Sequence, residues 1–106
     1  MFTKKERLTK KEFDHSFSVG TRHHCPSLQL IHHPSDSFHG AAVVGKKVYK
    51  KAVDRNRLRR QMYGVLYRHH TASALTGTFI LIAKPAIKKM NTSELSAEIQ
   101  TLVGKV

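Results

Sequence analysis

The spacing of apolar residues predicts one helix in the middle of the chain and another at its C-terminus. In the first, an apolar stripe recurs at i, i+4, i+7 and i+8, and it consists of Leu58, Met62, Val65 and Leu66. The residues predicted to point away from this stripe are Asn56, Arg60, Tyr63 and Tyr67. A capping motif at Asn91 and Glu94 precedes the second stripe, which contains Leu95, Ile99, Leu102, Val103 and Val106.

A short helix is also predicted near the N-terminus. Thr9 and Glu12 have the spacing of a capping box, in which each side chain accepts a hydrogen bond from the backbone N–H of the other residue. The leucine just before the box can pack on Phe13, and Phe13 and Phe17 lie one turn apart on the same face. Gly20 is suited to the left-handed conformation that often ends a helix.

Three segments are predicted to be strands. Residues 27–32, "SLQLIH", alternate in part and are followed by the turn signals of "HHPSDS". Residues 40–45, "GAAVVG", are small and mostly apolar, which favours a covered, central strand. Residues 78–83 end before Pro85, which cannot donate to a ladder. The resulting order is helix, strand, strand, basic segment with a helix, strand, helix, which indicates an α+β fold.

Length and composition predict one small, basic domain. The chain has 106 residues and a net charge of +12, from 19 Lys and Arg against seven Asp and Glu. We expect a single domain over residues 1–106. The charge points to nucleic acid or an anionic membrane surface as the partner. No apolar run approaches the about 18 residues that span a bilayer, and the N-terminus lacks the apolar core of a signal peptide, so we expect a cytoplasmic protein.

The charge is concentrated in residues 46–60, "KKVYKKAVDRNRLRR", which contain eight cations and one acid, Asp54. A solvated surface is the alternative interpretation of such a cluster. Here acids that could neutralise the cations are nearly absent, and the helical part is rich in arginine, whose planar fork suits phosphate and base stacking. The lack of a two-helix turn pattern favours RNA over DNA. The candidate RNA-binding residues are Lys46, Lys47, Lys50, Lys51, Arg55, Asn56, Arg57, Arg59 and Arg60.

The sequence does not favour a metal site or catalysis by side chains. Histidine pairs occur at positions 23–24, 32–33 and 69–70, but adjacent residues of a strand point to opposite faces, and no acid sits nearby at ligand spacing. Solvent-facing or RNA-facing histidines are therefore the preferred interpretation. The chain offers no Gly-rich phosphate loop, no Ser-His-Asp set in a plausible context and no carboxylate pair for acid–base chemistry. Cys25 is the only cysteine, which rules out an internal disulfide.

The basic segment and its surroundings resemble the bacterial ribonuclease P protein family. In that family two lysines at a strand end lead into Arg-Asn-Arg-x-Lys/Arg-Arg on a helix, and here "AAVVG" precedes "KKVYKKAVDRNRLRR". The opening "RLTKKEFDHSFSVG" and the strand "TFILIAKP" match the family as well, so the resemblance covers most of the chain. Two departures are that Tyr63-Gly64 stands where the family often has Arg-Glu, and that the first predicted strand lacks an aromatic residue facing the cleft.

The resemblance implies a fold and an activity. The fold would be an α-β sandwich of order αβββαβα with a left-handed βαβ crossover, like the second domain of a small-subunit ribosomal protein, and it has one strand more than the apolar pattern predicts. The activity would be that of the protein component of ribonuclease P, an endoribonuclease whose RNA subunit uses Mg²⁺ to remove the 5′ leader of precursor tRNA. The expected partners are the catalytic RNA and precursor tRNA, with no obligate protein partner and no cofactor held by protein side chains alone.

The resemblance also implies roles for individual residues. Those expected to contact the catalytic RNA are Arg55, Asn56, Arg57, Arg59 and Arg60, with Lys46 and Lys47 on the RNA backbone. Phe13 and Phe17 would line, with the sheet face, a cleft for the single-stranded leader, where bases can stack on aromatic rings. Ordinary core packing is the alternative for both rings. The alternative functions are a non-catalytic structural RNA-binding protein, like a ribosomal protein, and a DNA-binding regulator.

Overall fold

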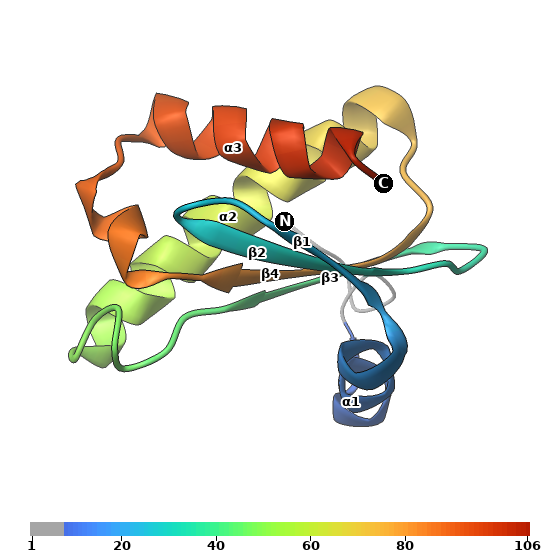
Figure 1. Ribbon diagram of the computed structural model, residues 1–106, viewed down its shortest axis with the longest axis horizontal. Helices are drawn as coiled ribbons and strands as arrows, with labels where there is room; N and C mark the ends of the chain where they lie inside the picture. The colour runs from blue at the N-terminus through green and yellow to red at the C-terminus, as the bar shows by residue number, and fades with distance from the viewer. Residues whose placement is uncertain (1–7) are drawn as a thin grey trace.

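The computed structural model describes residues 8–106, and in it helices lie on both faces of a four-stranded sheet (Figure 1). In chain order the elements are α1 (Lys10–Val19), β1 (Thr21–His24), β2 (Leu28–His33), β3 (Phe38–Val43), α2 (Ala52–Ser73), β4 (Gly77–Ala83), the 3-10 helix η1 (Pro85–Lys89) and α3 (Thr92–Gly104). This order confirms the α+β sandwich of order αβββαβα that the resemblance implies.

The apolar pattern missed one strand, β1. Its sequence "TRHH" is polar and largely exposed, so it carries no alternation that a pattern could detect. The strand pairs with β2 alone, because the order in the sheet is β1-β2-β4-β3. The backbone hydrogen bonds to β2, and not the side chains of β1, define this element.

The sheet is mixed, and its topology requires α2. The β1–β2 and β2–β4 pairs are antiparallel, whereas β3 and β4 are parallel neighbours. A parallel pair needs a crossover connection, and α2 supplies it between the end of β3 and the start of β4. The prediction of a central position for "GAAVVG" is wrong, because β3 is an edge strand. Its small apolar residues reflect cover on both faces, where Ala41 and Ala42 are each 8% exposed.

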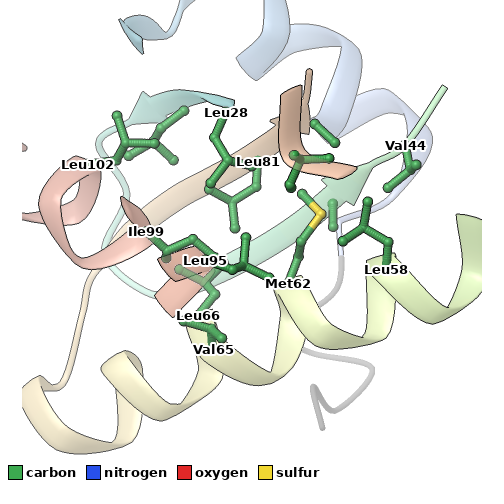
Figure 2. Packing of buried hydrophobic residues seen from close by; sticks show 14 of the residues in the cluster. Leu28, Val44, Leu58, Met62, Val65, Leu66, Leu81, Leu95, Ile99 and Leu102 are labelled. Carbon is green, nitrogen blue, oxygen red and sulfur yellow. The ribbon is translucent and has the colours of Figure 1, made fainter. Parts of the chain in front are cut away.

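The main core lies between the sheet and the layer of α2 and α3. Figure 2 shows side chains of both helices pointing toward Leu28 and Leu81 of the sheet. Every member of the predicted α2 stripe is buried, namely Leu58, Met62, Val65 and Leu66. In α3 the stripe holds through Val103, which is half-buried and packs against the core, but Val106 lies beyond the helix and is 50% exposed. Burial of these apolar side chains contributes most of the free energy that holds α2 and α3 against the sheet.

The apolar face of α2 is wider than its leucine and valine stripe. Tyr63 and Tyr67, which were predicted to point away from the core, are half-buried and pack against it. Their rings have an apolar body and a polar tip, so they can cover the rim of the core while the hydroxyl stays near solvent. The helix continues without interruption through Gly64, where an added Cβ would meet no atom within 4 Å.

A smaller apolar cluster holds α1 on the opposite face of the sheet. The predicted capping box is confirmed, since the Thr9 and Glu12 side chains each accept a hydrogen bond from the other residue's backbone N–H at 3.2 Å. Leu8 and Phe13 pack against the buried residues of this cluster, which are Ile31, Ala41 and Ile80. Phe13 therefore fixes α1 to the sheet.

Gly20 closes α1 for a different reason from the one predicted. Its φ of −70° is extended and not left-handed. A Cβ at this position would lie 2.5 Å from Ile31 Cγ2 and 2.6 Å from the Ser16 carbonyl oxygen. The glycine is needed because the end of the helix approaches β2 too closely for any side chain.

His32 is a polar residue within the apolar layer. Its ring packs against Phe79 at a centroid distance of 4.8 Å, and within residues 8–106 its Nε2 atom is buried without a hydrogen-bond partner. Burial lowers the pKa of His32, and the neighbouring His23 and His33 lower it further, while the nearby backbone of Thr76 opposes the shift. The folded protein therefore favours the neutral ring.

This shift predicts acid sensitivity. The unfolded chain binds a proton at His32 near its ordinary pKa of about 6.5, whereas the folded chain resists it, so His32 costs stability as the pH falls below about 6.5. We expect the free energy of unfolding in urea to fall less between pH 7 and pH 5 in His32→Phe than in the wild type. Equal pH dependence in the two proteins would contradict this assignment.

Candidate RNA-binding surface

The cationic segment, residues 46–60, runs from the loop after β3 into the first turns of α2. Six of its eight cations are exposed, and Arg55 and Arg59 are half-buried. Within the described residues one ion pair forms, between Arg57 Nη1 and Asp54 Oδ1 at 4.0 Å. The Arg57 side chain is 66% exposed, so this pair contributes little. Within residues 8–106, the positive charge of the segment is thus offset by acids only through this one weak pair.

Arg55 has a structural role in the cationic segment. Its Nη1 donates to the backbone carbonyls of Tyr49 at 3.0 Å and Lys50 at 2.7 Å. These two hydrogen bonds tie the loop after β3 to the first turn of α2, at a helix start whose N-cap, Lys51, makes no side-chain capping bond. Of the residues predicted to contact RNA, Arg55 is thus the one that also fixes the shape of the cationic segment.

Three of the remaining α2 candidates lie on one side of the helix start, while Arg57 lines a different hollow together with Asp54. Asn56, Arg59 and Arg60 line a shallow hollow of about 390 Å³ together with Tyr63. Arginine forks and an aromatic edge in one place are suited to phosphate oxygens and to the faces of unstacked bases. The structure therefore brings together four residues that the sequence placed on the helix, including the tyrosine that departs from the family pattern.

A second candidate surface lies around α1 on the opposite face of the sheet. Phe17 is 37% exposed, and its ring stacks on Phe13 at a centroid distance of 5.8 Å. Arg22 of β1 places its guanidinium carbon 4.7 Å from the Phe17 ring centre and donates to the Phe17 carbonyl at 3.0 Å. The two phenylalanines predicted for this surface therefore differ, because Phe13 is the anchor of α1 and Phe17 is its accessible ring.

Part of this sheet face extends beyond the cluster under α1. Val43 and Ile82 lie side by side in the β3–β4 register and are half-buried, and Gln29 stands opposite Ile82 in β2. Sequence reasoning missed Arg22, because it lies in the strand that patterning did not detect. Arg22 pairs with Ile31 in the β1–β2 register, but this pairing can be recognised only once β1 is known.

His32 and His33 point to opposite faces of the sheet, as strand geometry predicts, but the prediction of solvent-facing histidines is wrong for His32, whose Nε2 atom is buried. His32 packs on Phe79 in the main core, while His33 meets the His15 ring of α1, 5.5 Å away on the opposite face. In residues 8–106 no three His, Cys, Asp or Glu side chains are grouped so that they could hold a metal ion. The same part of the chain has no helix long and apolar enough to cross a membrane.

The fold and surface define a class: small, basic α+β proteins that present an arginine-rich helix beside a mixed sheet. The family model described as "Ribonuclease P" matches residues 2–106. A ribonuclease P protein component from Microcystis aeruginosa is 31% identical over 103 residues, covering 91% of this chain and 85% of the relative. The corresponding protein of Nitratiruptor is 26% identical over 98 residues, covering 92% and 88%.

Solved structures agree in fold. The ribonuclease P protein of Thermotoga maritima superposes with a TM-score of 0.83 at 18% identity, over 95% of this chain and 97% of that one. A Staphylococcus aureus ribonuclease P protein mutant with defective mRNA degradation activity gives 0.84 at 23%, over 95% and 87%. The chain therefore belongs to the family of bacterial ribonuclease P protein components. Membership implies a role in ribonuclease P, and hence in tRNA processing, with the ribonuclease P RNA as partner.

The structural role of Arg55 can be distinguished from the exposed ion pair of Arg57. We expect Arg55→Ala to lower the free energy of unfolding by about 1–2 kcal/mol, because a charged donor to two carbonyls is lost. Arg57→Ala should change it by less than about 0.5 kcal/mol, since its ion pair is exposed. Urea denaturation of the free protein measures both. Equal losses in the two variants would show that Arg55 does not hold the loop.

Proposed function

We propose that this protein binds the catalytic RNA of ribonuclease P through the cationic segment. The observation that supports the proposal most directly is the charge of that segment, eight cations against one acid, with one weak ion pair in the described part of the chain. Such a surface repels itself until phosphates approach it. The family fold and the matching Arg-Asn-Arg sequence support a folded RNA as the partner.

We further propose that the surface around α1 receives the 5′ leader of precursor tRNA. Phe17 offers an exposed ring on which a base can stack, with about 1–3 kcal/mol per stacked base and little sequence preference. Arg22 beside it adds a cation for the backbone, and the half-buried Val43 and Ile82 extend an apolar floor. Because α1 and α2 lie on opposite faces of the sheet, the two RNAs can be bound at once (Figure 1).

In this proposal the chemistry takes place on the RNA subunit. Mg²⁺ held by that RNA supplies the hydrolytic centre, and no protein side chain is assigned a catalytic role. The protein screens the repulsion between the catalytic RNA and precursor tRNA and holds the leader, so that less Mg²⁺ is needed for cleavage. A cytoplasmic location follows from this role.

Processing assays distinguish the proposal from a purely structural RNA binder. We expect the full chain to stimulate 5′ processing of precursor tRNA by a bacterial ribonuclease P RNA at low Mg²⁺. Affinity for that RNA should fall with salt at a log–log slope of about −4 to −5, if six cations meet phosphates. Salt-sensitive binding without any stimulation of cleavage would instead favour the ribosomal-protein-like alternative.

Substitutions on the two surfaces should have different effects. Arg57→Ala and Arg60→Ala should weaken assembly with the catalytic RNA, while Phe17→Ala should mainly reduce the preference for precursor over mature tRNA. Arg68→Ala, which removes an exposed cation farther along α2, is the matched control and should leave both measurements close to wild type. Equilibrium binding of each RNA measures these effects. The opposite pattern would mean that the two surfaces have been exchanged.

A further inference from the structure

Two hollows beside the start of α2 share one residue, Tyr49. The first, of about 490 Å³, is ringed by Lys46, Lys47, Lys50 and Lys88. Lys88 comes from η1, and its Nζ lies 5.4 Å from the centre of the Tyr49 ring. Four ammonium groups around one hollow provide a site for a phosphate group, because they have no carboxylate partner within residues 8–106.

The second hollow, which Tyr49 also lines, has a different chemistry. It measures about 450 Å³, within the range of about 300–1,000 Å³ typical of small-ligand sites. Its apolar floor is formed by Leu58, Ile87 and Leu95, which are each at most 7% exposed. Its polar rim comprises Asp54, Arg57, Gln61 and Asn91. An apolar floor with a few polar groups at the rim suits a flat, partly polar ring better than a phosphate.

Asp54 determines which ring fits best. It is the only acid of the cationic segment and it lines the hollow, with its Oδ1 4.0 Å from Arg57 Nη1. An ionised carboxylate only accepts hydrogen bonds, and its two oxygens can take two parallel donors. Guanine presents two adjacent donors on its Watson–Crick edge, N1–H and N2–H₂, whereas the corresponding edges of adenine and cytosine each offer one amino donor. Uracil likewise offers one donor, N3–H, so among the RNA bases guanine is the best match for a carboxylate.

We propose that these two hollows form a binding site for one unpaired guanine nucleotide of the RNA partner. The phosphate lies among the lysines, the base meets Tyr49, and the Watson–Crick edge of the base pairs with Asp54. Unstacked bases of single-stranded RNA are commonly recognised in this way, by an aromatic ring and by hydrogen bonds to the base edge. The inference rests on the proposed function, because it takes RNA as the partner of the cationic segment.

The substitution Asp54→Asn separates this proposal from simple charge attraction. It removes one negative charge and takes the net charge from +12 to +13. If only electrostatics mattered, every RNA would bind more tightly. The amide can accept only one of the two guanine donors, so the proposal predicts weaker binding of a guanine-containing RNA, by about tenfold. The two explanations thus predict changes of opposite sign.

The test uses the full chain and four RNA hairpins that differ only in one bulged nucleotide, which is guanosine, inosine, adenosine or cytidine. At fixed salt, we expect the guanosine hairpin to bind wild type about tenfold more tightly than the adenosine or cytidine hairpin. Inosine lacks the N2 amino group and should be intermediate. Asp54→Asn should abolish the preference, and so should Tyr49→Leu, while Tyr49→Phe should retain it.

Asp36→Asn is the matched control, because it makes the same charge change in the exposed turn between β2 and β3. It should keep the guanosine preference. Equal affinity of wild type for all four hairpins, or tighter binding of the guanosine hairpin by Asp54→Asn, would overturn the inference while leaving salt-dependent binding of ribonuclease P RNA intact. Loss of all salt-dependent RNA binding would overturn the proposed function together with it.

Discussion

Repulsion among the cations of the cationic segment is the constraint on which the arrangement of this protein depends. Eight positive side chains follow the edge strand β3, and within the described residues one weak ion pair is all that offsets them. The segment keeps its shape because its ends are fixed by other means. Val48 and Leu58 are buried in the main core, and Arg55 ties the loop to the helix through two backbone carbonyls. Burial of apolar residues thus holds together cationic side chains that would otherwise move apart.

The mixed sheet gives this charge a useful position. The parallel β3–β4 pair requires a crossover, so α2 must start at the edge of the sheet and cross one of its faces. That face is filled by α2 and α3, which leaves the other to α1 and to a shallow apolar surface. A protein of 106 residues thereby acquires two separate surfaces of different chemistry, one cationic and one aromatic. The proposed binding of two RNAs assigns one of these surfaces to each.

Sequence reasoning succeeded where side-chain chemistry and periodicity coincide. The α2 stripe, both capping boxes and the basic segment could be predicted, because each depends on local spacing. It failed where long-range packing decides the outcome. β1 exists through pairing with β2, Gly20 is required by the proximity of Ile31, and Tyr63 and Tyr67 cover a core rim that no helical wheel shows. The hydrogen bonds of Arg55 to the loop after β3 likewise depend on a loop conformation that the sequence does not specify.

The position of β3 at the edge of the sheet has a consequence for the free protein. An edge strand of small apolar residues is a template for pairing with another chain, and such pairing leads to aggregation. Here the strand runs directly into lysines, so a second copy approaching that edge would bring its own positive charge with it. The charge of the cationic segment therefore also acts as a gatekeeper, because it opposes edge-to-edge pairing of two copies of this chain.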